Sequence, residues 1–179
     1  MIVLNHVSWL DIFVLDAVMP VTFVAKAEIG RWPLVGTLVT RAGTLYIERG
    51  SKSAARKTSE RVAQALRDGV PVAVFPEGTT STGESVQRFH TALFQPAVDT
   101  SSTVLPAVLR YCDAHGKLTH AAAYVGEDSL IGSIWMIVSQ RRMSARLEFL
   151  EPISAGGGDR RMLAERSREA IAAALASQN

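Results

Sequence analysis

The sequence contains little cysteine and no long apolar run, and these two shortages narrow what the chain can be. Cys112 is the single cysteine of the 179 residues, so no disulfide can form within the chain. The most apolar stretch, residues 9–25, is interrupted by Asp11, Asp16 and Pro20, whereas a membrane-spanning helix needs about 20 largely apolar residues. A charged start followed by a small-residue cleavage site, the pattern of a secretory signal peptide, is also missing. We therefore expect any membrane contact to be peripheral.

Strong net charge, metal-ligand spacing and a nucleophile elbow are missing as well. The formal charge of +2 and the isoelectric point near 8.9 are too weak to indicate a nucleic-acid partner, but they suit an anionic membrane surface. His90, His115 and His120 do not have the spacing of metal ligands, so we expect no metal. The absence of a Gly-x-Ser-x-Gly motif argues against an ordinary serine hydrolase.

Short β-rich runs alternate with longer helical patterns along the chain. Strands are predicted at residues 2–5, 22–25, 44–48, 71–75, 104–109 and 146–150. Helices are predicted at residues 8–18, 34–41, 53–68, 91–98, 129–140 and 160–177. This alternation predicts an α/β fold in which helices flank a mostly parallel central sheet. The length suffices for one compact domain, and we expect a single domain spanning residues 1–179.

His6 and Asp11 belong to the segment Asn-His-Val-Ser-Trp-Leu-Asp, which follows the first predicted strand. We expect His6 at the end of that strand, Ser8 as N-cap of the next helix and Asp11 at its third position, a capping-box-like pattern. One interpretation is purely structural, since Asp11 could cap the helix and His6 could be an ordinary polar residue. In the functional interpretation, the helix dipole keeps the carboxylate ionised and the carboxylate fixes one imidazole nitrogen. The other nitrogen could then take a proton from a substrate hydroxyl.

Two basic side chains are candidates for binding a substrate anion at the end of predicted strands. Arg49 follows the strand at residues 44–48, where its guanidinium could grip a phosphate in bidentate fashion. Taken alone, a surface pair with Glu48 is the simpler interpretation. Lys26 follows an earlier strand and could be a second cation facing the same edge.

A third motif begins where the apolar strand at residues 71–75 runs into Pro76, Glu77, Gly78 and Thr79. Pro76 ends the sheet pairing, and Gly78 permits an unusual backbone angle or the close approach of a ligand. A plain turn accounts for the proline and the glycine, but it does not require the carboxylate of Glu77. Because each motif follows a predicted strand, all of them should meet at the carboxyl edge of a parallel sheet, where open α/β sheets bind ligands.

In this order the motifs resemble the four sequence blocks of the glycerolipid acyltransferases, whose type member is bacterial 1-acylglycerol-3-phosphate acyltransferase. The matching blocks are Asn-His-x-Ser-x-x-Asp, Gly-x-x-x-Ile-x-Arg, Phe-Pro-Glu-Gly-Thr and an apolar strand that ends in Pro106. The resemblance covers roughly residues 2–110. The first and third blocks together are highly specific. The resemblance therefore supports the expected convergence of the motifs independently of their positions after predicted strands.

The resemblance implies a glycerol-3-phosphate acyltransferase-like fold and a role for each matched position. His6 would be the general base and Asp11 its orienting partner. The reaction would move a fatty acyl group from acyl-CoA or acyl-carrier protein to a lysophospholipid hydroxyl, with 1-acylglycerol-3-phosphate as the expected acceptor. No metal or other cofactor is implied, and the enzyme would act peripherally on the cytoplasmic face of the inner membrane. The positions expected to bind substrate are Arg49, Glu77, Gly78 and Thr79, with Lys26 as a further candidate.

Two departures from the family pattern leave alternatives open. Many members have Phe-Lys-x-Gly after the third block, whereas this chain has Phe89-His90-Thr91-Ala92, a variant that resembles a proteobacterial subgroup with lyso-ornithine lipid acyltransferases. Family members also carry an N-terminal hydrophobic segment before the first block, and we expect that anchor to be absent from this sequence, in which His6 is almost the first residue. A lyso-ornithine lipid O-acyltransferase and a non-catalytic lipid-binding remnant are the two alternatives.

A helical stripe in the C-terminal half is the main candidate for membrane contact. Such a stripe more often packs into a protein core, but it could also lie on a membrane. Residues 32–35 form a second candidate, an insertion loop. The residues of the stripe are Leu130, Ile131, Ile134, Trp135 and Val138, and they are followed by Arg141 and Arg142.

Overall fold

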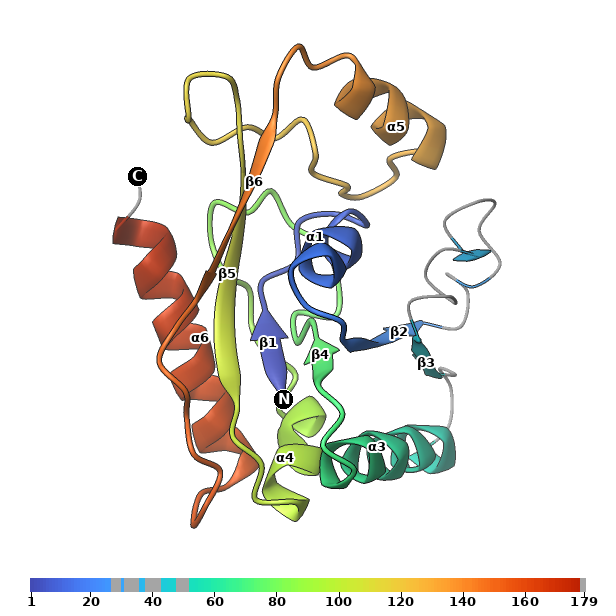
Figure 1. Cartoon of the computed structure of the whole chain (residues 1–179), viewed down its shortest axis with the longest axis vertical. Coiled ribbons are helices and arrows are strands. Elements are labelled where there is room, and N and C mark those ends of the chain that lie inside the picture. Colours follow the sequence, from blue (N-terminus) through green and yellow to red (C-terminus); the bar gives the residue numbers. More distant parts are fainter. Residues whose placement is uncertain (27–29, 31–35, 38–42, 48–51, 178–179) are drawn as a thin grey trace.

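A six-stranded sheet lies at the centre of the protein (Figure 1). The computed structural model describes residues 1–26, 30, 36–37, 43–47 and 52–177. The strand order is β3-β2-β4-β1-β5-β6, and neighbours pair in parallel except for β5 and β6. The predicted α/β class with a mostly parallel sheet is therefore confirmed. The strands are β1 (Ile2–Leu4), β2 (Thr22–Lys26), β3 (Leu45–Ile47), β4 (Val72–Val74), β5 (Leu105–Cys112) and β6 (Ser144–Phe149).

The helices agree with the sequence patterns to within a few residues, with two differences. The helix predicted at residues 91–98 consists of a 3-10 turn followed by a short α-helix, because Pro96 lacks the amide hydrogen and suits only the first turn. The helix predicted at residues 8–18 starts only at Asp11. The helix predicted at residues 34–41 falls mostly outside the described residues. The helices are α1 (Asp11–Val18), α3 (Lys52–Arg67), η2 (Thr91–Phe94), α4 (Gln95–Asp99), α5 (Leu130–Val138) and α6 (Arg160–Ser177).

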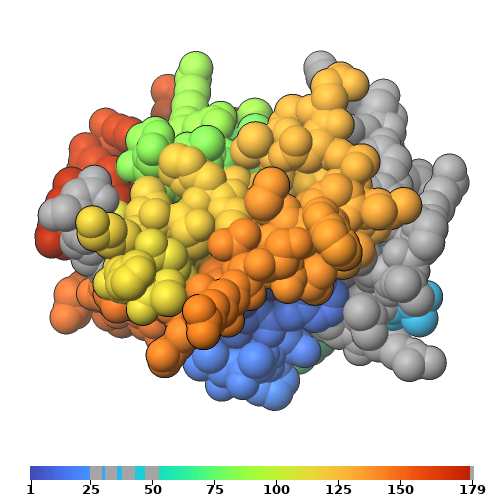
Figure 2. All heavy atoms as spheres, turned by 90° about the horizontal axis from the view of Figure 1, so that it is seen from above, coloured from blue at the N-terminus to red at the C-terminus, as the bar shows by residue number. Residues whose placement is uncertain are grey.

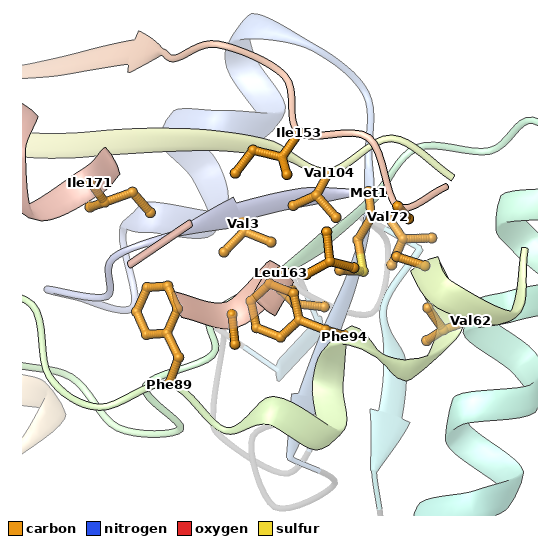
Figure 3. Close-up of a cluster of buried hydrophobic side chains, with 14 of the residues drawn as sticks. Met1, Val3, Val62, Val72, Phe89, Phe94, Val104, Ile153, Leu163 and Ile171 are labelled. Carbon is orange, nitrogen blue, oxygen red and sulfur yellow. The ribbon is translucent and has the colours of Figure 1, made fainter. Parts of the chain in front are cut away.

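Successive strand residues point alternately into two apolar layers. Figure 3 shows one layer, in which Val3, Val72 and Val104 meet Leu163 and Ile171 of α6. The other layer joins the remaining strand positions to α1 and includes Ile2, Leu4, Ala73, Ala107, Ile12 and Leu15. Both faces of the sheet are covered at its centre, and the two central strands β1 and β4 are accordingly apolar throughout.

The carboxyl ends of β1 and β4 point to the same edge, and α1 and α5 lie above that edge in Figure 1. β5 runs three residues beyond its predicted end, because its antiparallel ladder with β6 continues to the pair Cys112–Ser144. None of the helices among the described residues is long and apolar enough to cross a bilayer. That residues 1–179 form a single domain stays a prediction.

Candidate active site

The β1–α1 loop, taken as residues 5–10 together with Asp11 at the start of α1, leaves the carboxyl edge of the sheet through Asn5. The side-chain amide of Asn5 donates to the Leu109 carbonyl at 2.9 Å, and its oxygen accepts from the Leu109 amide at 2.8 Å. These two bonds continue the pairing of β1 with β5 one step past the end of β1. Because Asn5 is buried, the point at which His6 departs from the sheet is fixed.

His6 and Asp11 face each other across this loop. The Nδ1 atom of His6 lies 2.7 Å from Oδ2 of Asp11, whose side chain is fully buried, whereas 19% of the His6 side chain is exposed. An ionised carboxylate accepts, so Nδ1 carries the hydrogen and Nε2 has the free lone pair. The His6 ring stacks on Phe75 with 4.1 Å between ring centroids, which sets the orientation of the imidazole.

Asp11 accepts four hydrogen bonds from the described residues. Oδ2 also accepts from the amides of Val7 at 2.7 Å and Ser8 at 3.0 Å, and Oδ1 accepts from the Tyr111 hydroxyl at 2.8 Å. Burial, together with the charge of Asp11, raises the pKa of Tyr111 well above its ordinary value, so the phenol stays a donor. The carboxylate is therefore solvated by the protein and held in one orientation.

The prediction that Ser8 is the N-cap of α1 is wrong. The helix begins at Asp11, Leu10 occupies the cap position and no side chain bonds at that cap. Ser8 instead starts a tight turn, in which the amide of Asp11 bonds to the Ser8 carbonyl at 3.2 Å. One half of the expected capping box is present, because Asp11 binds the Ser8 amide. The same carboxylate therefore shapes the loop and binds His6.

Glu77 comes from the loop after β4 and holds the main chain of His6. Oε1 accepts from the His6 amide at 2.7 Å, and Oε2 accepts from the Gln87 amide at 2.9 Å. The side chain is buried, and burial raises the pKa of Glu77 although both backbone bonds oppose that rise. Both oxygens thus serve main-chain donors, and the predicted contact of Glu77 with substrate stays a prediction.

The residues that follow Glu77 complete the surroundings of the His6 main chain. The carbonyl of His6 accepts from the Ser81 amide at 2.8 Å, so the loop after β4 binds the main chain of His6 at both its amide and its carbonyl. Gly78 has φ of 70°, and a Cβ there would lie 2.9 Å from the His90 ring. Both the backbone angle and the lack of space therefore favour glycine at this position. Thr79 is exposed beside it. The described geometry thus brings His6, Asp11, Glu77 and Gly78 together.

The two predicted cations cannot be placed in the same way. Lys26 is the last residue of β2, opposite Ile47 of β3, and only its main chain is described. Arg49 lies outside the described residues. Their roles in binding an anion stay predictions. Among the described residues, no three His, Cys, Asp or Glu side chains gather into a set that could hold a metal ion.

Sequence reasoning missed three residues that support the His6–Asp11 pair. Tyr111 lies 100 positions from Asp11 in a strand of mostly apolar residues, and no local pattern marks it. Asn5 stands inside the first quoted motif and Ser81 lies two residues after the third, yet their bonds to the main chain could not be deduced from residue type. A polar residue at the end of a buried strand is the one signal that could have indicated Tyr111.

The chain matches known acyltransferases over most of its length. The sequence model of the Acyltransferase family matches residues 1–110. A lyso-ornithine lipid O-acyltransferase from Pseudomonas aeruginosa is 40% identical over 173 residues, which cover 97% of this chain and 66% of that protein. A 1-acyl-sn-glycerol-3-phosphate acyltransferase from Neisseria meningitidis is 39% identical over 173 residues, covering 96% and 68% respectively. The chain thus spans about two thirds of the length of these relatives.

A solved structure has a similar fold. The crystal structure of the 1-acyl-sn-glycerophosphate acyltransferase from Thermotoga maritima superposes with a TM-score of 0.65 at 23% identity. The match covers 98% of this chain and 64% of that one.

Proposed function

The chain belongs to the acyltransferase family, and we propose that it moves a fatty acyl group from a thioester donor to the free hydroxyl of a lysophospholipid. The donor is acyl-CoA or acyl-carrier protein. The observation that supports this proposal most directly is the 2.7 Å contact between His6 Nδ1 and the buried Asp11 carboxylate. It leaves Nε2 of a partly exposed imidazole available at the edge where α/β sheets bind ligands.

The proposed reaction uses His6 as a general base and then as a general acid. Nε2 takes the proton of the acceptor hydroxyl while the hydroxyl oxygen bonds to the carbonyl carbon of the thioester. The carbon–sulfur bond then breaks, and the departing thiolate takes the proton back from Nε2. Asp11 stabilises the imidazolium that exists between these steps. No metal or cofactor takes part in this scheme.

Three residues are proposed to position this pair. Glu77 binds the His6 amide, Ser81 binds the His6 carbonyl, and Tyr111 fixes the second oxygen of Asp11. Rigid placement of the base matters because a displacement of about 1 Å can cost roughly 10²-fold in rate. Gly78 and Thr79, which follow Glu77 in the chain, are proposed to line the acceptor site.

The acceptor is proposed to be 1-acylglycerol-3-phosphate, which would give phosphatidic acid, with Lys26 and Arg49 binding its phosphate. Lyso-ornithine lipid is the second candidate, because the relative from Pseudomonas aeruginosa has that acceptor in its name and matches at 40% identity. His90, whose ring lies against Gly78, is close enough to the proposed site to influence this choice. Both acceptors are amphiphiles, so we further propose that the enzyme acts peripherally at the cytoplasmic face of the inner membrane.

Release of free thiol from acyl-CoA, with and without lysolipid, tests the proposal. The wild-type chain should release thiol only when lysolipid is present, and His6→Ala should lower that rate by roughly 10²–10⁴-fold. His115→Ala is the matched control, because His115 is exposed in the turn after β5, and it should keep the wild-type rate. Absence of turnover in the wild-type chain, with lipid binding retained, would instead favour the non-catalytic remnant.

A panel of acceptors with one acyl-CoA donor distinguishes the two candidate substrates. Turnover of 1-acylglycerol-3-phosphate is expected to exceed that of lyso-ornithine lipid. Turnover of lyso-ornithine lipid alone would mean that Arg49 does not act as a phosphate ligand in the proposed way.

A further inference from the structure

The outward side of α5 carries large apolar side chains that the rest of the described chain does not cover. Exposed fractions are 81% for Ile131, 72% for Trp135, 66% for Val138 and 53% for Met136. Ile131, Trp135 and Val138 are spaced by four and three positions, so they lie along one side of the helix. We call these four side chains the α5 face. Exposed apolar patches of this kind usually mark a surface that contacts something else.

The opposite side of α5 is fixed to the candidate active site. The Nε1 atom of Trp9, in the β1–α1 loop, donates to Oγ of the buried Ser133 at 3.1 Å. Leu130 and Ile137 pack against the apolar clusters around α1 and β5. Ser129 caps the helix by accepting from the Gly132 amide at 3.1 Å. The orientation of α5 is therefore set by these contacts, and the α5 face is held outward next to the His6 loop.

Figure 2 looks down on this end of the molecule, and α5, in light orange, forms part of its outer surface beside α1, in blue. Basic charge follows the helix, because Arg141 and Arg142 are both exposed. The acidic residues Glu127 and Asp128 lie at the other end, before the helix begins. A tryptophan among aliphatic side chains, with arginines at one end, is the composition of a helix that lies in the interface of a bilayer.

We propose that the α5 face docks on an anionic lipid surface and so brings the edge carrying His6 to the membrane. The reason for such docking rests on the proposed function, since an acceptor that is an amphiphile must be taken from a bilayer. A second copy of the chain is a poorer occupant. Four side chains are far fewer than the roughly 20–30 residues a side of a standard protein interface.

Flotation with phospholipid vesicles, in the absence of substrate, tests the docking. The wild-type chain should bind vesicles that contain phosphatidylglycerol and bind weakly to vesicles of phosphatidylcholine alone. The double variant Ile131→Asn/Trp135→Ser should lower the partition coefficient by at least roughly tenfold. Val70→Ser is the matched control, because Val70 is 40% exposed just before β4, at the opposite edge of the sheet, and it should bind as wild type.

The arginine pair is tested separately, so that a folding defect in one variant does not decide the outcome. Arg141→Gln/Arg142→Gln should weaken binding to anionic vesicles by roughly fivefold per charge and leave binding to neutral vesicles unchanged. Lys57→Gln/Arg61→Gln, an equal loss of charge on the exposed side of α3, should have a much smaller effect.

Three results would overturn the docking proposal. They are wild-type binding by the Ile131→Asn/Trp135→Ser variant, no binding of the wild-type chain to anionic vesicles, and a wild-type dimer that this variant converts to a monomer in light scattering. The last would make the α5 face an interface between copies. His6→Ala should bind vesicles as the wild-type chain does, so a failure of the catalytic proposal is distinguishable from a failure of docking.

Discussion

The β1–α1 loop and the α5 face lie at the same end of the molecule but are built in opposite ways. In the loop, Asp11 is fully buried, and its two oxygens accept four hydrogen bonds from the chain itself. On the α5 face, Trp135 and Ile131 are mostly exposed and have no apolar cover among the described residues. The loop is thus organised before any substrate arrives, whereas the described chain leaves most of the α5 face without contacts. Changes in the loop should therefore alter catalysis, and changes on the α5 face should alter binding to lipid surfaces.

The largest effect is expected from Asp11→Asn, which removes the charge of the loop with little change in shape. An amide oxygen can still accept from His6, but a neutral partner stabilises the imidazolium far less. We expect kcat to fall by roughly 10²–10⁴-fold, as measured by lysolipid-dependent thiol release. Asp16→Asn, an exposed aspartate on the same helix, is the control and should be close to wild type. A loss below tenfold for Asp11→Asn would contradict the proposed pair.

Glu77→Gln should have the next largest effect, because it disturbs the hydrogen bonds that hold the main chain of His6 and leaves the imidazole itself unchanged. A carboxylate can accept from both the His6 and Gln87 amides, whereas the NH₂ group of glutamine must face one of these donors. The resulting shift of the His6 main chain should lower kcat by roughly 10²-fold. Gln87→Ala keeps the main-chain donor and should retain wild-type activity. Equal losses in both variants would contradict the assigned role.

The same substitution should change how stability depends on pH. Burial raises the pKa of Glu77 above its ordinary value of 4.5, so the folded chain holds this proton more tightly than the unfolded chain does. The contribution of Glu77 to stability is therefore largest below pH 4.5 and falls as the pH rises through the window between the two pKa values. Urea unfolding measured across that window should show the decline in the wild-type chain and a weaker decline in Glu77→Gln.

Tyr111→Phe should have a smaller effect on rate and a characteristic effect on its pH dependence. Without the phenol, Oδ1 of Asp11 loses its hydrogen-bond donor in a buried site. The protein then stabilises the negative charge of the carboxylate less, so the carboxylate favours the protonated imidazole more strongly. Glu77, the other ionisable group bonded to His6, is unchanged. The acid limb of kcat/KM should therefore move to higher pH, with a loss of roughly fivefold near neutral pH and recovery at higher pH.

Tyr124→Phe serves as the control for this experiment. Tyr124 reaches the same loop through its main-chain amide, which bonds to the Val7 carbonyl at 3.0 Å and survives the substitution. A purely structural defect in Tyr111→Phe would lower the rate equally at all pH values. Such a uniform loss would contradict a positioning role for Tyr111.

The sequence predicted most of the sheet and the contact between His6 and Asp11, because both depend on residues that are close together in the chain. Apolar runs between turn signals located the strands, and the resemblance to acyltransferases is confirmed. Tyr111 could not be predicted, since its contact with Asp11 depends on how β5 pairs with β1 across 100 positions. The extension of β5 was missed for a similar reason, as its last residues are held by β6 rather than by their own hydrophobicity.

The role of α5 was undecidable from the sequence for a different reason. Nearly every residue from Leu130 to Val138 is apolar, so the pattern does not reveal which side faces the core. The structure separates the two sides, because Ser133 is buried against Trp9 while Trp135 is exposed. A small polar residue thus faces inward and the largest apolar one faces outward, the reverse of what side-chain polarity alone suggests.

This reversal gives the smallest expected effect and a direct test of the contrast between the two regions. Trp135→Ser removes a large side chain that packs on little, so the free energy of unfolding should stay within about 0.5 kcal/mol of wild type. Ser133→Ala removes only one hydroxyl, yet it leaves the Trp9 indole without its acceptor and should cost about 0.5–1.5 kcal/mol. Urea denaturation of both variants in the absence of lipid measures the difference. If the serine change proved the milder of the two, α5 would have to pack on the chain through Trp135, and the α5 face would not be available to a membrane.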